Sequence, residues 1–318
     1  MGIAANGKPR VLVTSEELVR LVRLPEDKYD ISVLNVQPDR DAWLREHGVG
    51  IRAIVSSGME RLDAARLAML PDLELIAVVA AGMAGIDLAA ASARGIAVTN
   101  AGDLNSGDVA DFAVTLMLAH VRDLKAADAY VRDGQWPHRR MPLGRSVASE
   151  RVGIVGLGHI GRAAAERLAP FGCAIRWWGP RSKPDAPWER MESLDALAGW
   201  ASTLLVAVAG SNETRGLVTA KTIEALGPDG LIVNVARGFV IDEPALKAAL
   251  KEGRLRGAAL DVVAREPDDG SGWADVPNLL LAPHIAGSTR EAFDAVMASA
   301  GENVARLMAG EPLLRRVV

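Results

Sequence analysis

Residues 152–161 read VGIVGLGHIG, an apolar run followed at once by the Gly-x-Gly-x-x-Gly pattern of Gly156, Gly158 and Gly161. This pattern indicates a dinucleotide site only where it joins a β-strand to an α-helix. The preceding RVGIVG (151–156) has the composition of a buried strand, and the following GRAAAERLAPFG (161–172) contains good helix formers. The stretch therefore predicts a strand, a tight turn and a helix of a doubly wound α/β domain.

Each glycine of the pattern has its own physical task. Gly156 allows the tight turn, Gly158 lets the backbone approach a pyrophosphate, and Gly161 allows the helix to pack closely on the strand. The helix then offers free N–H groups and the positive end of its dipole to the phosphates. We therefore predict a bound dinucleotide; the alternative is a turn without a ligand. His159 is expected to face solvent or a phosphate rather than to act as a catalyst.

Strand-like and helix-like segments alternate along most of the 318 residues, and such alternation predicts parallel sheets covered by helices. A first series occupies residues up to about 100, and a second runs from about 100 to 288, so two α/β domains are expected. Long helical patterns cover 106–134 and 289–310, and the second of these could return to the first domain. The expected strands are 10–14, 29–35, 51–57, 73–79, 96–100, 151–156, 174–178, 203–210, 230–236, 256–263 and 279–284.

Composition and charge exclude several classes of function. The net charge is −4, and no Lys/Arg cluster is interleaved with aromatic residues, so no nucleic-acid partner is expected. The most apolar stretch, 75–86, is shorter than the roughly 20 residues of a membrane span, and the N-terminus lacks a signal-peptide pattern. Cys173 is the only cysteine, so no disulfide and no cysteine-based metal site is expected, which fits a reducing cytoplasm.

The segment after the second strand of the dinucleotide unit bears on the choice of cofactor. NAD-binding units usually carry an acid there to bind the ribose, whereas this chain has Gly179-Pro180-Arg181-Ser182-Lys183 and no acid before Asp185. Arg181 and Lys183 could neutralise a 2′-phosphate, and Ser182 could donate to it. These residues predict a preference for NADP(H); the alternative is two solvated turn charges.

Three residues with suitable chemistry follow predicted buried strands. His284 follows LLLAP, Arg237 follows GLIVNVA, and Glu266 follows RGAALDVVA. Ligands of open α/β sheets bind at these carboxyl ends, so the three side chains are expected to meet there. Arg237 would hold a substrate carboxylate and polarise the carbonyl, His284 would donate a proton, and Glu266 would fix the imidazole. Asp261 would support the site or face the cofactor.

Five stretches resemble, in the same order, those of the D-isomer-specific 2-hydroxyacid dehydrogenase family. The resemblance spans nearly the whole chain. It is greatest to NADP-dependent glyoxylate/hydroxypyruvate reductases and hydroxyphenylpyruvate reductases, as RSKP (181–184) and EALGPDGLIVNVARG (224–238) indicate. The five stretches are AAGMAGIDLAAASARGIAVTNAGD (80–103), VGLGHIGRAAAERLAPFG (155–172), NVARGFVIDEPALKAAL (234–250), GAALDVVAREP (257–267) and APHIAGST (282–289).

The resemblance implies an architecture and an activity. A Rossmann cofactor domain, 101–288, would be inserted in a flavodoxin-like substrate domain made of 1–100 and 289–318. The activity would be the NADPH-dependent reduction of small 2-keto acids, namely glyoxylate, hydroxypyruvate or aryl pyruvates, to D-2-hydroxy acids. The cytoplasmic enzyme would be a homodimer formed through the cofactor domain.

The resemblance also implies roles for single residues. It places a catalytic Arg–Glu–His set on Arg237, Glu266 and His284, and substrate-carboxylate binding on the N–H groups of Ala81 and Gly82. Trp136 would either reach the partner's active site or lie at an interface or surface; with Met83 and Met141 it would make the pocket moderately apolar. The expected cofactor contacts are Gly156, Leu157, Gly158, His159, Ile160, Gly161, Gly179, Arg181, Ser182, Lys183, Val208, Ala209, Thr214, Val235, Ala236, Arg237, Asp261, His284 and Ala286.

The chain departs from the family pattern at two positions. Ala209 stands where a proline is common, and Gly179 stands where NAD-dependent members have Asp, which favours NADP. Glu266 in place of a glutamine argues against formate dehydrogenase activity. Two alternatives remain: an NAD-dependent dehydrogenase of the phosphoglycerate or phosphite type, and a dinucleotide-sensing corepressor of the same fold.

Overall fold

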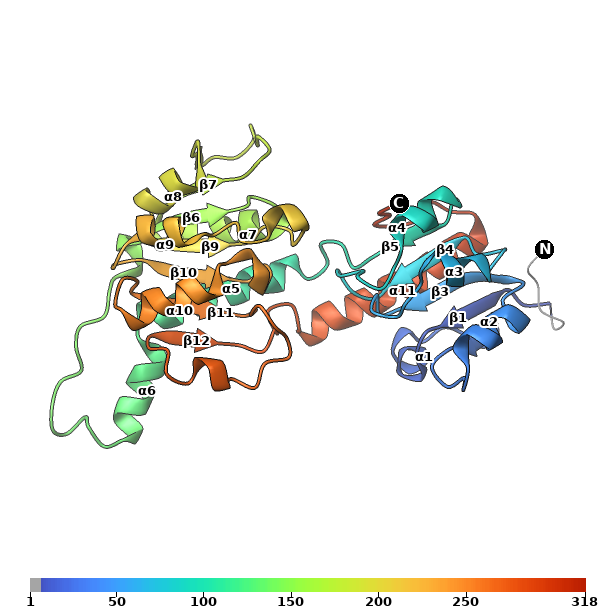
Figure 1. The fold of residues 1–318 in the computed structure, drawn as a ribbon, viewed down its shortest axis with the longest axis horizontal. Coiled ribbons are helices and arrows are strands. Elements are labelled where there is room, and N and C mark those ends of the chain that lie inside the picture. The colour runs from blue at the N-terminus through green and yellow to red at the C-terminus, as the bar shows by residue number, and fades with distance from the viewer. Residues whose placement is uncertain (1–6) are drawn as a thin grey trace. The chain divides into compact units, whose positions relative to one another are not determined.

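The computed structural model describes residues 7–318, and the chain divides into two compact α/β units (Figure 1). The first unit ends at Asn105 and resumes over Arg290–Val318, whereas the second covers Ser106–Thr289. The expected domain boundaries, 100/101 and 288/289, stand within five residues of this division. Which ligand each unit binds is taken up below as a proposal.

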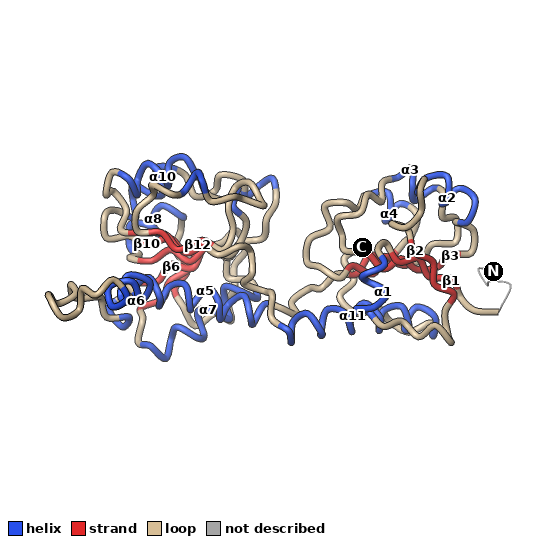
Figure 2. The backbone as a smooth tube through the Cα atoms, turned by 90° about the horizontal axis from the view of Figure 1, so that it is seen from below, coloured by secondary structure: helices blue, strands red, loops and turns tan. Residues whose placement is uncertain are grey.

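The first unit contains a parallel sheet of five strands within its described residues, in the order β2-β1-β3-β4-β5. This is the flavodoxin-like order, in which the chain moves outward from β1 in both directions. Helices cover both faces of the sheet, with α2, α3 and α4 on one face and α1 and α11 on the other (Figure 2). The bounds are β1 Arg10–Val13, α1 Glu16–Val22, β2 Asp30–Val33, α2 Arg40–His47, β3 Ile51–Ser56, α3 Ala64–Ala68, β4 Leu75–Val78, α4 Leu88–Ala93, β5 Ala97–Thr99 and α11 Arg290–Ala309.

The second unit contains a parallel sheet of seven strands over residues 106–289, in the order β12-β11-β10-β9-β6-β7-β8. The six strands from β8 to β11 have the Rossmann order, and β12 extends the sheet beyond them. The bounds are α5 Ser106–Val121, α6 Leu124–Arg132, β6 Arg151–Val155, α7 His159–Leu168, β7 Ala174–Trp178, β8 Glu189–Arg190, α8 Leu194–Trp200, β9 Thr203–Val206, α9 Ala220–Leu226, β10 Leu231–Asn234, α10 Glu243–Lys251, β11 Gly257–Leu260 and β12 Leu279–Leu281.

Burial on both faces explains why the strands read as continuous apolar runs rather than as alternating ones. In the second unit, Ile154 and Leu205 face the cluster that contains α5 and α7, while Val155 and Leu204 face the cluster that contains α8, α9 and α10. The predicted fold class, two doubly wound parallel-sheet domains, is confirmed. No helix among residues 7–318 is both long enough and apolar enough to cross a membrane.

The structure corrects two details of the sequence-based expectations. The helical pattern at 106–134 forms two helices, because Asp123 lies in the left-handed region (φ 50°) and interrupts the helical hydrogen bonds. Strand β8 was not expected, because a two-residue polar strand has no periodicity to detect.

Candidate active site

The glycine pattern forms the turn between β6 and α7. Gly156 adopts a left-handed φ of 94°, and a Cβ there would lie only 2.7 Å from Cγ1 of Val208. A Cβ on Gly161 would lie 2.0 Å from the carbonyl oxygen of Gly156. Both positions therefore need glycine for close packing, which accounts for the first and third glycines without a ligand.

Gly158 differs from its two neighbours in the pattern. No atom lies within 4 Å of the place where its Cβ would be, so packing within the unit does not demand a glycine. It is the N-cap of α7, and within the described chain no side chain caps the helix there. Beyond His159, the first N–H groups of α7 can therefore bind a ligand, as a pyrophosphate requires. These residues fit a dinucleotide.

Other expected cofactor contacts lie along the edge that continues from this turn. Val208 and Ala209 follow β9, and the Thr214 hydroxyl donates to the carbonyl of Ala209 at 2.9 Å, so it shapes this loop. Val235 and Ala236 follow β10 and are buried. After β7, Arg181 and Ser182 are exposed and Lys183 is half-buried. Within the described chain their side chains form no hydrogen bond or ion pair, so all three are available to an anion.

The three residues expected to take part in the reaction follow three adjacent strands. Arg237 follows β10, Glu266 follows β11 and His284 follows β12, and these strands pair in parallel, so their carboxyl ends share one edge. His284 Nδ1 lies 2.6 Å from Oε2 of Glu266, and the other oxygen of Glu266 accepts from the N–H of Val263 at 3.0 Å. Glu266 thus holds one ring nitrogen of His284 and leaves Nε2 for a substrate.

Asp261 fixes the backbone that carries His284. It is 2% exposed, and its two carboxylate oxygens accept from the N–H groups of Ile285 (2.8 Å) and Ala286 (3.0 Å). The N–H of His284 donates to the Asp261 carbonyl at 2.8 Å, while His284 has a left-handed φ of 56°. In this structure Asp261 therefore supports the site through the main chain.

Asn234, at the end of β10, does the same for Arg237 and was missed in the sequence. Its buried side chain accepts from the N–H of Ala236 at 3.0 Å and donates to the carbonyl of Arg237 at 3.1 Å. An asparagine inside the apolar run LIVNVA was the available signal, since a buried amide needs partners. The Arg237 guanidinium donates to the Ala236 carbonyl at 2.6 Å.

The segments carrying Arg237 and Glu266 touch each other at one point. A Cβ on Gly238 would lie 1.9 Å from both the carbonyl carbon and the carbonyl oxygen of Val263, so a side chain there would overlap main-chain atoms. Arg237 precedes this glycine, and the N–H of Val263 binds Glu266. The structure therefore brings Glu266 and His284 into contact and places Arg237 on the adjoining segment.

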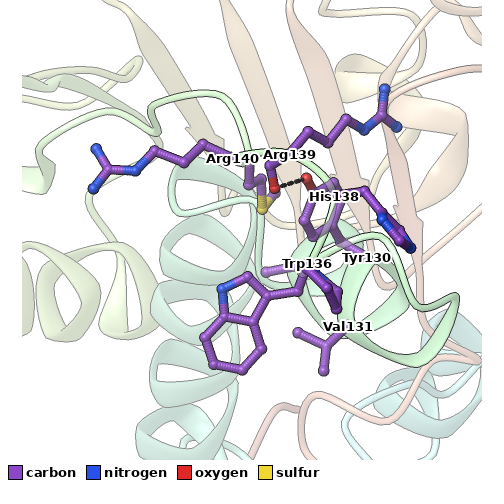
Figure 3. A pocket seen from close by; sticks show the side chains of 9 residues that line it. Tyr130, Val131, Trp136, His138, Arg139 and Arg140 are labelled. Atoms are coloured by element: carbon purple, nitrogen blue, oxygen red, sulfur yellow. Dashed lines mark hydrogen bonds between the residues drawn. The ribbon is translucent and has the colours of Figure 1, made fainter.

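Two pockets in the second unit separate residues that the sequence analysis placed together. A pocket of about 580 Å³ includes Glu266, His284, Pro267, Trp273 and Leu281 in its lining. Trp136 and Met141 instead line a pocket of about 470 Å³ beside α6, with Tyr130 and Arg139 (Figure 3). The Trp136 ring is 70% exposed there. Within one copy of the second unit, Trp136 and Met141 thus do not line the pocket of the His–Glu pair.

In the first unit, Ala81 and Gly82 follow β4 at the carboxyl edge of the sheet, and both are exposed. Asn100 donates to the Ala81 carbonyl at 3.1 Å, which fixes the segment, and no atom lies within 4 Å of a Cβ built on Gly82. Their N–H groups are placed where open sheets bind ligands. Met83 packs against the core of this unit.

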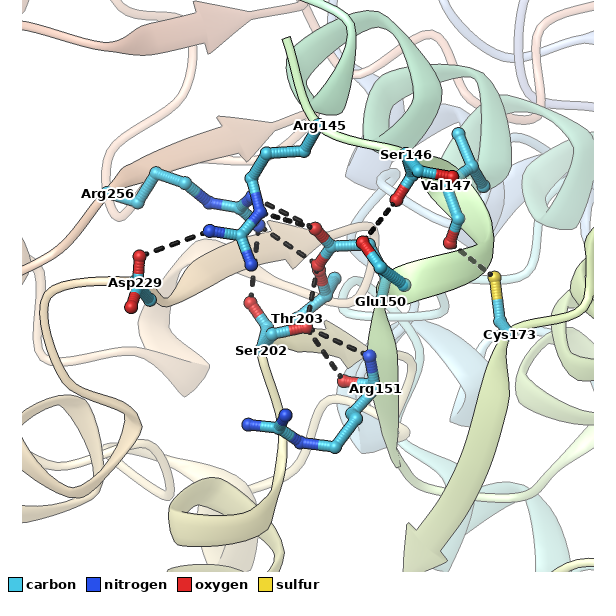
Figure 4. A network of polar contacts seen from close by, with 11 residues as sticks. Arg145, Ser146, Val147, Glu150, Arg151, Cys173, Ser202, Thr203, Asp229 and Arg256 are labelled. Carbon is cyan, nitrogen blue, oxygen red and sulfur yellow. Dashed lines mark hydrogen bonds and ion pairs between the residues drawn. The ribbon is translucent and has the colours of Figure 1, made fainter.

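The amino edge of the seven-stranded sheet holds a second carboxylate–cation cluster (Figure 4). Glu150, just before β6, is fully buried, and Arg256 donates to both of its oxygens at 3.0 and 3.1 Å. Ser202 and Thr203 donate to it at 2.7 and 2.8 Å, and Arg145 at 3.2 Å. Burial alone would raise the pKa of Glu150, but the hydrogen bonds from Arg256, Ser202 and Thr203 outweigh it and hold the pKa below its usual value.

Comparisons with known proteins agree with this geometry. The family described as D-isomer specific 2-hydroxyacid dehydrogenase, NAD binding domain, matches residues 114–286. The chain is 39% identical to the 2-ketogluconate reductase of Gluconobacter oxydans over 248 residues, 78% of this chain and 80% of the relative. It is 36% identical to the hydroxyphenylpyruvate reductase of Plectranthus scutellarioides over 282 residues, 89% of this chain and 90% of the relative.

Among solved structures, one similar chain is the NADPH-dependent glyoxylate/hydroxypyruvate reductase of Sinorhizobium meliloti, in complex with NADP and malonate. The TM-score is 0.85 at 31% identity, and the match covers 98% of this chain and 97% of that one. The dinucleotide turn, the paired histidine and glutamate and the parallel Rossmann sheet define a pyridine-nucleotide oxidoreductase. This chain belongs to the D-isomer-specific 2-hydroxyacid dehydrogenase family.

Proposed function

We propose that this protein reduces small 2-keto acids to D-2-hydroxy acids with NADPH, and that His284 donates the proton. The observation that carries the proposal is the 2.6 Å contact between His284 Nδ1 and Glu266, on the same sheet edge as Arg237 and a turn that fits a dinucleotide. When bound, the cofactor supplies a hydride to the keto carbon.

The remaining chemistry belongs to side chains of this chain. Arg237 binds the substrate carboxylate and polarises the keto oxygen, because a guanidinium offers parallel donors to both. His284 Nε2 gives its proton to that oxygen as negative charge develops. Glu266 holds Nδ1, which orients the ring so that Nε2 can give its proton to the substrate.

The first unit is proposed to bind the substrate and the second the cofactor. The N–H groups of Ala81 and Gly82 are proposed to bind the substrate carboxylate. Glyoxylate and hydroxypyruvate are the proposed substrates, with aryl pyruvates and ketogluconate as further candidates. The named relatives reduce, by their descriptions, glyoxylate, hydroxypyruvate, hydroxyphenylpyruvate or 2-ketogluconate.

The preference for NADPH over NADH rests on the segment after β7. Arg181 and Lys183 present two positive charges and Ser182 a hydroxyl, where an NAD-binding unit would carry an acid. The S. meliloti relative was solved with NADP. A 2′-phosphate would thus meet complementary charge in place of repulsion.

A homodimer formed through the second unit is the proposed assembly, located in the cytoplasm. Helix α6 has no buried residue among those described, and the segment from α6 to 143 exposes four large apolar side chains, more than a single copy explains. Trp136 is proposed to complete the partner's active site. The four exposed residues are Leu124, Val131, Trp136 and Leu143.

The proposal is tested by following NADPH and NADH oxidation with glyoxylate, hydroxypyruvate, phenylpyruvate and 2-ketogluconate. We expect turnover with at least one of them and a higher kcat/KM for NADPH. Equal values for the two cofactors would reject the NADPH preference. Absence of turnover with every keto acid, while the cofactor still binds, would favour a sensing role over catalysis.

A further inference from the structure

Arg190, a residue of β8, fixes the beginning of the loop between β7 and β8. Arg190 donates from Nη2 to the carbonyl of Gly179 at 2.7 Å, and its guanidinium lies 5.7 Å from the centre of the Trp177 ring. The Trp177 indole in turn donates to the carbonyl of Trp188 at 3.0 Å. These contacts fix the main chain at both ends of the loop that carries the charged side chains.

Asp185 is the one acidic residue in this loop, 179–188, and it stands two positions after Lys183. Its side chain is 70% exposed. A phosphate group bound by Arg181 and Lys183 would share the loop with this carboxylate, and like charges repel. The loop thus combines residues that attract a 2′-phosphate with one that opposes it.

Arg162 counters that acid from the neighbouring helix. It is the residue after Gly161, in the first turns of α7, and its Nη2 lies 2.6 Å from Oδ2 of Asp185. The N-terminus of the same helix is proposed to bind the pyrophosphate. The Arg162–Asp185 pair therefore joins the two segments proposed to bind the two phosphate-bearing parts of NADP(H).

We propose that Arg162 is a specificity-determining residue, which favours NADP(H) by neutralising Asp185 beside the place of the 2′-phosphate. The inference rests on the proposed assignment of the 179–183 segment to the 2′-phosphate. A surface ion pair contributes little to folding stability, so the pair is explained better by its effect on a ligand than on the fold. In this proposal Arg162 acts on the cofactor indirectly, by pairing with Asp185, and not by its own contact with the phosphate.

The size of the effect follows from Coulomb's law in water. An uncompensated carboxylate roughly 8 Å from a doubly charged phosphate weakens binding about three- to tenfold, and salt reduces the effect. NADH lacks this phosphate, so its binding should change by less than about twofold. The ratio of the two dissociation constants is therefore the sensitive quantity.

The experiment is a fluorescence titration of NADPH and NADH into the wild type, Arg162→Gln, Asp185→Asn and the double variant at low salt. Arg162→Gln should weaken NADPH about three- to tenfold and leave NADH unchanged, and the double variant should regain wild-type NADPH affinity. Arg254→Gln is the matched control, because it removes an equal charge from an exposed ion pair with Glu252. Thermal melts confirm that each variant is folded.

The outcomes separate this inference from the proposed cofactor preference. A double variant that binds NADPH as weakly as Arg162→Gln would overturn the inference, because Arg162 would then act by its own contact with the cofactor. An equal loss for NADPH and NADH in Arg162→Gln would also overturn it. Equal affinities in the wild type would instead reject the preference, while the variants would still report whether Arg162 and Asp185 are coupled.

Discussion

Each edge of the seven-stranded sheet has a carboxylate that binds a nitrogen-bearing side chain, but the two carboxylates differ in burial. At the carboxyl edge, Glu266 lies 2.6 Å from His284, and their side chains are 33% and 45% exposed. At the amino edge, Glu150 is fully buried and accepts from Arg256 through both oxygens (Figure 4). In each pair a carboxylate binds a nitrogen-bearing side chain, but only the Glu266–His284 pair is open to a ligand.

The two carboxylates also differ in how many hydrogen bonds each accepts. Glu150 receives hydrogen bonds from Arg256, Ser202, Thr203 and Arg145, so any change of its protonation disrupts a filled network. Glu266 binds one main-chain N–H and one imidazole whose other nitrogen forms no hydrogen bond within the described chain. A closed cluster suits stability, whereas an open pair suits proton transfer.

The largest expected effect tests the open pair. His284→Ala should lower kcat for keto-acid reduction by about 10²–10⁴-fold, because the proton donor is lost. NADPH affinity and Tm should stay close to the wild type, since the imidazole is partly exposed. Steady-state kinetics and a cofactor titration measure both. His47→Ala, at the end of α2, is the control, and unchanged turnover in His284→Ala would remove this residue from the mechanism.

The next effect tests the closed cluster. Glu150→Ala should lower the free energy of unfolding by about 3–5 kcal/mol, because it leaves Arg256, whose side chain is only 16% exposed, without its counter-charge. Urea unfolding measures this loss. Glu252→Ala, which breaks an exposed pair with Arg254, should cost less than about 1 kcal/mol. Equal losses in the two variants would show that burial does not distinguish the edges.

A smaller effect is expected when the open pair keeps its shape and loses its charge. Glu266→Gln retains a group that can hydrogen-bond to His284 but lacks the negative charge of the carboxylate. We expect kcat to fall about 10–100-fold, with a changed dependence of kcat on pH. The pH profile is the informative measurement, because a purely structural role of Glu266 would lower the rate equally at every pH.

The smallest effect concerns acid stability. The pKa of Glu150 is held below its usual value near 4.5, so in acid the unfolded chain binds a proton that the folded one does not. The stability from this group is present above about pH 4.5 and is lost as the pH falls through the lowered value. Unfolding free energies measured at several pH values should therefore fall less steeply for Glu150→Gln. Parallel curves for the two proteins would contradict this.

The carboxyl edge was readable in the sequence because each residue proposed to react follows a mostly apolar run. A run that is mostly apolar, even with one polar residue such as Asn234 or Asp261 in it, marks a buried parallel strand, and its end marks the ligand edge, so Arg237, Glu266 and His284 could be grouped although they lie far apart in sequence. The glycine pattern was also readable, because a strand-like run directly precedes it and a helix-like run directly follows it.

The amino edge and the supporting contacts were not readable. Glu150 looks like an ordinary loop acid, since nothing near it in the sequence signals that Arg256, over a hundred residues later, will pair with it. Asn234 and Asp261 each stand out as a polar residue within an apolar run, but the sequence does not show which main-chain groups they bind. Local periodicity also cannot detect a two-residue strand such as β8 or a helix broken by one left-handed residue, Asp123.

The contact between Gly238 and the main chain at Val263 limits how the enzyme can be altered. A single methyl group at position 238 would push apart the segments that carry Arg237 and Glu266. Substitutions of Gly238 should therefore not be tolerated. New substrate range, whether selected in the laboratory or by evolution, would have to come from the walls of the pocket. The spacing between Arg237, the proposed ligand of the substrate carboxylate, and Glu266, the partner of His284, would stay unchanged.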